Sequence, residues 1–253
     1  MPDTFAITII FIIVCTVVGA FIKGRTKDRC LDDFSGFRVT LERADGKTVW
    51  GKLRVENSGL ELIYDKPYFD EKDGHAETSY ILYKNEYGDL RHIVCYLDEL
   101  DPAKAELRAK SLEKTTNPAW HSRLTRRVRN VFGTVRDSIL EVFNLFMGKM
   151  KSAGSVGKLL QGQDKYIAQM QQQAFSAVGS AYEPILERYL GKRVIMAVVR
   201  EGKKKEYEGI LKDYTTEFIE LLDIKYKEGG EQKVREADIL VPRALGTVRH
   251  SGV

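Results

Sequence analysis

The sequence predicts an α+β protein with one N-terminal transmembrane helix and two small β-barrels that are separated by a helical segment. Three observations lead to this prediction: an uncharged apolar run near the N-terminus, two later segments that repeat one strand pattern, and helical periodicity between them. The 253 residues include 30% charged side chains and carry a net charge of +4, as expected of a chain that folds. Because acidic residues nearly balance basic ones, composition alone does not indicate a nucleic-acid-binding protein.

The predicted anchor spans residues 5–22, inside a first segment of residues 1–22, and contains no charged side chain. Such a run is close to the shortest helix that spans the hydrocarbon core of a bilayer. The side chains expected to face lipid are Phe5, Ile9, Ile10, Phe11, Ile12, Ile13, Val17, Val18, Phe21 and Ile22. Two alternatives stay open: a buried core helix, and a cleaved signal peptide, although no basic side chain precedes the run.

A basic linker, residues 23–35, follows this run directly, and its cations are Lys23, Arg25, Lys27 and Arg29. Positive segments stay on the cytoplasmic side of a membrane. The pattern therefore predicts a single-pass protein of the inner (cytoplasmic) membrane, with its N-terminus outside and most of the chain in the cytoplasm. The three cysteines have no C-x-x-C spacing, which favours a reducing compartment over a disulfide framework.

Two later segments repeat one pattern of short strands and glycine turns. The first covers residues 36–101 and the second 191–245, with a tail of residues 246–253. Both alternate apolar and polar residues, which is typical of a strand meander with one buried face. Gly51 and Gly209 stand at matching places inside a strand, where each predicts a sharp bend or bulge.

Both copies resemble the Sm-like small β-barrel, over residues 37–100 and 190–245. The second copy matches best, from Tyr189-Leu190-Gly191-Lys192-Arg193-Val194 through Asp223. A short helix precedes the first strand in that family, and residues 182–190, with Pro184 near their start, match it. The RNA-binding members use an Asp and an Asn where this chain has Thr215 and Ile219. The resemblance therefore implies the fold and ring assembly, and it does not imply the family's uridine pocket.

Residues 102–190, between the two copies, are predicted to be largely helical. Asp101-Pro102 has the residue types of a helix N-cap and first position. From Trp120 onward, apolar residues recur every three or four positions, and the start of this helix is basic, through Arg123, Arg126, Arg127 and Arg129. Two interpretations stay open: the apolar stripe packs on the barrels or a neighbouring subunit, or the helix lies on an anionic membrane surface.

The remaining motifs give no chemistry. Lys203, Lys204 and Lys205 are predicted to form a charged hairpin turn, and the alternative is a contact with phosphate or lipid head groups. The phosphate-loop-like segment 153–158 lacks the first glycine and the magnesium-binding hydroxyl of that motif. No metal-ligand or catalytic spacing is present in the sequence, so it predicts no enzyme activity, no cofactor and no metal.

The predicted function is that of a membrane-anchored, non-enzymatic scaffold that assembles into a homo-oligomer through the open strand edges of its barrels. The predicted partners are the lipid bilayer, further copies of the chain and another membrane or cytoplasmic protein. Two alternatives come from other classes of protein. One is a membrane-tethered nucleic-acid-binding protein, for which the sequence argues less strongly, and the other is a channel-like or mechanosensing element.

Overall fold

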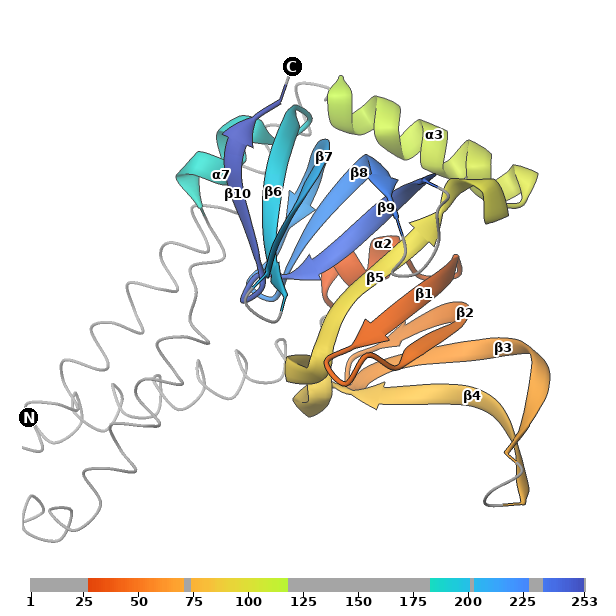
Figure 1. Ribbon diagram of the computed structural model, residues 1–253. Coiled ribbons are helices and arrows are strands. Elements are labelled where there is room, and N and C mark those ends of the chain that lie inside the picture. The colour runs from red at the N-terminus through yellow and green to blue at the C-terminus, as the bar shows by residue number, and fades with distance from the viewer. Residues whose placement is uncertain (1–26, 71–73, 118–182, 201–202, 228–233, 253) are drawn as a thin grey trace, which may run out of the picture.

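The computed structural model describes residues 27–70, 74–117, 183–200, 203–227 and 234–252. Ten antiparallel strands form one continuous sheet in the order β10-β6-β7-β8-β9-β5-β1-β2-β3-β4 (Figure 1). The sheet encloses two hydrophobic cores, one in each half of the molecule. The two halves are consecutive in the chain, and each contributes five neighbouring strands to the sheet.

The first half begins with a short helix and continues as a meander. Its elements are α2 (Arg29–Asp33), β1 (Arg38–Arg43), β2 (Thr48–Glu56), β3 (Gly59–Asp70), β4 (His75–Tyr83), η1 (Lys84–Asp89), β5 (Leu90–Tyr96) and η2 (Leu97–Glu99). Along β2, buried and exposed side chains alternate from end to end, so one face of this strand belongs to the core. β5 returns to pair with β1, and α3 (Pro102–Thr116) follows.

The second half repeats this order with α7 (Pro184–Tyr189), β6 (Arg193–Arg200), β7 (Lys203–Tyr214), β8 (Phe218–Tyr226), β9 (Arg235–Pro242) and β10 (Gly246–Ser251). One backbone hydrogen bond shows how closely the halves match. The Gly36 N–H donates to the Leu53 carbonyl oxygen at 2.7 Å, and the Gly191 N–H donates to that of Leu211 at 2.8 Å. From the strand pairing and these hydrogen bonds, many residues of the first half can therefore be matched with an equivalent residue of the second half.

Two glycines let neighbouring strands approach closely. A Cβ atom on Gly51 would lie 2.6 Å from the Ile63 carbonyl oxygen, and one on Gly209 would lie 2.6 Å from that of Leu222. Both distances are far below van der Waals contact. A side chain at either position therefore requires β3 or β8 to move.

The predicted fold class is wrong. The described chain is mainly antiparallel sheet with short helices, not α+β with an N-terminal transmembrane helix and two separate barrels. The barrels are not separate because β5 pairs with β9 and so joins both sets of strands. Among the described residues, the longest helix is α3, with 15 residues, and its sequence is polar.

The membrane assignment is corrected with the fold class. No helix within the described ranges is long and apolar enough to cross a membrane, so the structure does not support a single-pass protein of the inner membrane. The predicted anchor, residues 5–22, lies outside the described residues, as does the long amphipathic helix predicted from Trp120. The last strand also continues to Ser251, beyond the predicted end of the second barrel at residue 245.

Gly51→Ala and Gly209→Ala are expected to lower the free energy of unfolding by about 1–3 kcal/mol each, because the added methyl group meets a neighbouring backbone oxygen. Urea unfolding measures this change. Gly88→Ala is the control, since a Cβ atom there has nothing within 4 Å. If Gly209→Ala were as stable as Gly88→Ala, the close approach of β7 to β8 would be wrong.

Candidate functional site

The two halves meet where β5 pairs with β9, and each half completes the core of the other. The opposed residues at this junction are Ile93 with Leu240, Val94 with Ile239, Cys95 with Asp238 and Tyr96 with Ala237. Leu240 is a residue of the second half that is buried in the core of the first. Val94 and Tyr96 are residues of the first half that are buried in the core of the second. Neither core is therefore complete without the other half.

Helix α2 fastens the first half onto β7 of the second. The Arg29 guanidinium donates from Nη2 to the Tyr214 carbonyl oxygen at 3.1 Å. At the other end of the helix, the Asp33 carboxylate lies 3.0 Å from the Lys212 ammonium group. Cys30, between them in sequence, is completely buried, and burial raises the pKa of its thiol.

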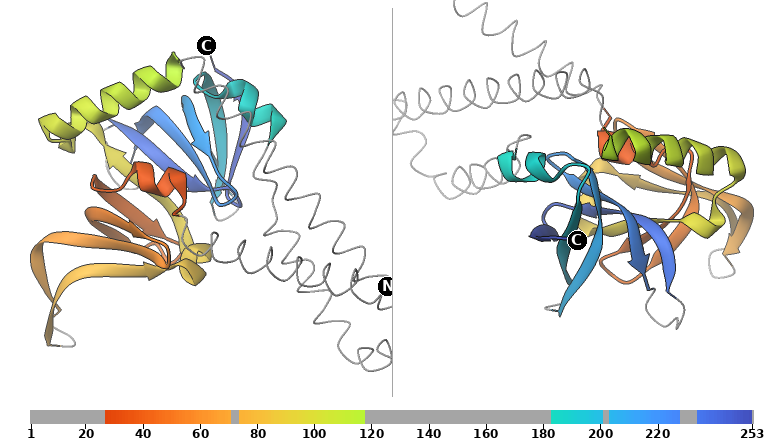
Figure 2. Two further views of the ribbon diagram at one scale, coloured as in Figure 1. Left: turned by 180° about the vertical axis from the view of Figure 1, so that it is seen from behind. Right: turned by 90° about the horizontal axis from the view of Figure 1, so that it is seen from above.

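Helix α3 lies beside the strands of the second half (Figure 2). Arg108 joins it to Asp223 of β8 and Asp238 of β9. The guanidinium group donates to both carboxylate oxygens of Asp238, at 2.7 and 2.8 Å, and also contacts Asp223. The Asp223 N–H donates to Asp238 at 3.0 Å. Burial by itself would lower the pKa of Arg108, but the hydrogen bonds and charge of Asp238, and then of Asp223, raise it above its ordinary value.

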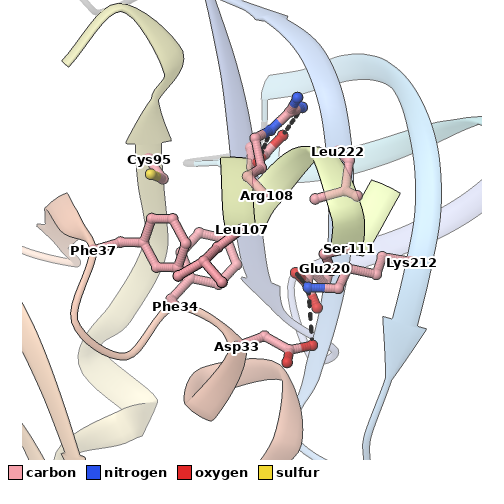
Figure 3. Close-up of a pocket in the computed structure, with 11 residues that line it drawn as sticks. Asp33, Phe34, Phe37, Cys95, Leu107, Arg108, Ser111, Lys212, Glu220 and Leu222 are labelled. Atoms are coloured by element: carbon pink, nitrogen blue, oxygen red, sulfur yellow. Dashed lines mark hydrogen bonds and ion pairs between the residues drawn. The ribbon is translucent and has the colours of Figure 1, made fainter. Parts of the chain in front are cut away.

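A cleft of about 180 Å³ lies between α2, α3 and the strands of the junction (Figure 3). Part of its lining is apolar, from Phe34, Phe37, Leu107, Leu222 and the thiol-bearing Cys95. The charged groups in the lining are Asp33, Arg108, Lys212, Glu220 and Asp238, which amounts to two cations and three carboxylates. The cleft of the junction therefore carries an excess of acid.

Glu220 is the most deeply buried charged group of the cleft, with a side chain that is 1% exposed. Its Oε1 accepts a hydrogen bond from Lys212 at 2.9 Å, and its Oε2 has no hydrogen-bond partner in the described structure. Burial raises the pKa of Glu220 well above its ordinary value, Lys212 lowers it in part, and Asp33 raises it again. Burial therefore makes the charged form of Glu220 costly, and the Lys212 ammonium group offsets part of that cost.

The sheet ends in two strands, β4 and β10, that are equivalent to the strands of the junction. β4 corresponds to β9, because Glu61 lies opposite Ile81 as Glu220 lies opposite Leu240. β10 corresponds to β5, because each of them pairs with the first strand of its own half. In the part of the chain that the structure describes, β4 and β10 each have only one neighbouring strand.

The β3–β4 hairpin exposes large apolar side chains where the equivalent β8–β9 hairpin buries them. Phe69, Ile81 and Tyr83 are 58%, 52% and 56% exposed. Their equivalents, by pairing along the two hairpins, are Tyr226, Leu240 and Pro242, which are all buried at or beside the junction. This hairpin projects away from the second half (Figure 1), and among the described strands only β3 pairs with β4.

Helix α7 shows the same contrast with α2. Leu31 and Leu186 occupy the same place, since each is buried in the core of its half, five residues before Gly36 or Gly191. The preceding residues are Cys30, which is fully buried in the same core as Leu240 of the second half, and Ile185, which is 64% exposed. Each open end of the sheet therefore presents apolar groups whose counterparts are buried at the junction.

The structure brings few of the predicted site residues to this junction. Arg29 lies in it, whereas Lys27 pairs with Glu56 at 3.9 Å. The lysines predicted to form a turn lie in β7, which begins at Lys203; Lys204 pairs with Glu206 at 2.6 Å, and Lys205 donates to the Lys227 carbonyl oxygen at 3.0 Å. Lys23, Arg25, Arg123, Arg126, Arg127, Arg129 and the anchor side chains lie outside the described residues.

Comparisons of the chain with models of protein families, with curated proteins and with solved structures found no match. Within the described ranges, no three His, Cys, Asp or Glu side chains are grouped so that they could hold a metal ion. A proposed function therefore rests on the β5–β9 junction and on the two edge strands β4 and β10.

Arg108→Met is expected to destabilise the protein by about 3–5 kcal/mol, because it leaves the buried Asp238 carboxylate without its counter-charge. The side chains of Arg108 and Asp238 are only 15% and 6% exposed. Thermal or urea unfolding measures the loss. Lys110→Met, on an exposed face of the same helix, is the control, and equal stability of the two variants would mean that Arg108 does not hold α3 in place.

Glu220 is expected to make stability depend on pH. Burial raises the pKa of Glu220 above its value of about 4.5 in the unfolded chain, so the folded protein holds the carboxyl proton more tightly than the unfolded chain does. The free energy of unfolding therefore falls as the pH rises from about 4.5 through the pKa of the folded protein. Glu220→Gln should remove this part of the pH dependence, measured as the urea midpoint against pH. Glu61→Gln, at the equivalent position, where the side chain is 27% exposed, is the control, and an unchanged pH profile in Glu220→Gln would contradict the assignment.

Proposed function

We propose that the protein is a non-enzymatic scaffold that assembles head to tail into a homo-oligomer, in which β4 of one copy pairs with β10 of the next. The observation that carries this proposal is the junction within the chain. There, a strand equivalent to β4 already pairs with a strand equivalent to β10. Two open edges that are equivalent to a formed contact can pair in the same way, and every copy presents one of each.

The register of the junction predicts the register between copies. Ile93 lies opposite Leu41 in its own half, as Val248 lies opposite Met196. The junction pair Ile93–Leu240 therefore becomes Val248 of one copy with Ile81 of the next. By the same rule, Val94–Ile239 becomes His250 with Tyr80. This pairing would cover Ile81, and it brings Ile185 of one copy toward the first half of the next.

Apolar burial and backbone pairing both favour this contact. Complete burial of one large apolar side chain stabilises by about 1.5–3 kcal/mol. Phe69, Ile81, Tyr83 and Ile185 are each more than half exposed in a single copy, so most of this gain is still available. Strand addition also pairs the backbone groups of two open edges. Together these terms oppose the entropy lost on association.

The contact is heterologous, so it generates either a closed ring or an open filament. A ring leaves no strand edge unpaired, which is the arrangement that limits further aggregation. Ring assembly is also what the resemblance to Sm-like barrels implies. We therefore propose the closed ring as the form of the scaffold.

The full-length protein is expected to form one discrete oligomer in multi-angle light scattering, and Ile81→Lys or Ile185→Lys should reduce its mass to smaller species. A lysine on either surface places a charge where an apolar side chain would be buried. The control is Val234→Lys, at a side chain that is 54% exposed beside the central strand β9. A monomeric unaltered protein, or an Ile81→Lys protein that assembles like the control, would refute the proposal.

The predicted register can be tested separately by cross-linking Ile81→Cys and Val248→Cys in one chain with a short thiol-specific reagent. Opposed residues of antiparallel strands have Cβ atoms about 4.5–5.5 Å apart, so a ladder of linked chains is expected. Cys15→Ser removes one native thiol from this background, and Cys30 and Cys95 are buried. Either cysteine alone is the control, which should give dimers at most.

A further inference from the structure

We infer that the cleft formed between two copies binds a small phosphate-type oxyanion. This inference rests on the proposed head-to-tail assembly and concerns the equivalent, between copies, of the cleft at the junction. The two clefts share a place in the fold, but their charged residues differ.

α2 contributes an acidic residue, Asp33, to the junction, and α7 has a basic residue, Arg188, at the equivalent position. Asp33 stands three residues before Gly36, and Arg188 stands three residues before Gly191. Both follow the buried leucine of their helix by two positions, so both occupy one place in the fold. Asp33 reaches Lys212 across the junction at 3.0 Å. Between copies, Arg188 would approach the corresponding cation instead.

That cation is Arg54 of the next copy. Arg54 lies opposite Glu61 and 3.5 Å from it. In the second half Asp213 lies opposite Glu220, and Lys212, at the register shift between Leu211 and Asp213, lies 2.9 Å from Glu220. Arg54 is the more accessible of the two cations, with a side chain that is 61% exposed against 13% for Lys212. The cleft between copies would therefore place two guanidinium groups beside a single carboxylate.

The rest of the lining changes in the same direction. Phe37 is replaced by Lys192, the residue after Gly191, and Cys95 and Asp238 are replaced by Ser251 and Ser79. Where the junction has two cations and three carboxylates, the cleft between copies has three cations, Arg54, Arg188 and Lys192, and one carboxylate, Glu61.

This composition is that of an oxyanion site. Guanidinium groups donate paired hydrogen bonds that match the oxygens of phosphate, and serine hydroxyl groups can donate further ones. Without an anion, Arg54 and Arg188 repel each other across the contact, which opposes association. A bound phosphate group removes this repulsion. Assembly between copies should therefore depend on the anion, whereas the junction inside each chain should not.

The test measures the association of the full-length protein by light scattering in chloride and in inorganic phosphate at equal ionic strength. Phosphate should strengthen association about tenfold, the effect of one charge-assisted hydrogen bond. Arg188→Asp recreates the acid of the junction, so this variant should assemble in chloride and lose its response to phosphate. Lys110→Asp, with the same change of charge on α3, should keep the response.

The outcomes separate the two proposals. If the protein and Arg188→Asp assemble equally in chloride and phosphate, the oxyanion site is refuted and the scaffold stands. If no condition gives assembly or cross-linking, both are refuted. A response to single-stranded DNA without any response to inorganic phosphate would also refute the small-anion site, because it would assign the contact to a nucleic-acid backbone.

Discussion

The pairing of β5 with β9 is the contact on which the rest of the structure depends. It makes one sheet from two similar halves, and it places Leu240 in one core and Val94 and Tyr96 in the other. Each half supplies the apolar surface that the other lacks. The same pairing leaves β4 and β10 at the ends of the described sheet. β9 and β5 pair with each other inside the chain, whereas their equivalents β4 and β10 lie at opposite ends of the sheet.

The charged groups around the junction are buried only because they are arranged in pairs. Arg108 is matched by Asp238 and Asp223, and Lys212 by Asp33 and Glu220. A buried ion pair adds little net stability, but removal of one partner is costly. These pairs therefore fix where α2 and α3 sit more than they add to stability, and they shape the cleft between them.

The sequence predicts local features well where a short pattern determines them. Asp101 caps α3 as expected, with its side chain accepting from the Lys104 N–H at 2.8 Å, and Pro184 begins α7. The pairing of β5 with β9 could not be predicted in this way, because the apolar pattern of Leu240 is the same whichever core buries it. Extending the internal repeat to the preceding helices would have revealed the matched pair Asp33 and Arg188.

Because each chain contains two halves and one internal junction, any closed assembly of these chains has an even number of halves. Its rotational symmetry equals the number of chains, not the number of halves, since neighbouring contacts are of two kinds. Acidic and basic clefts would then alternate around the circumference, once each per chain.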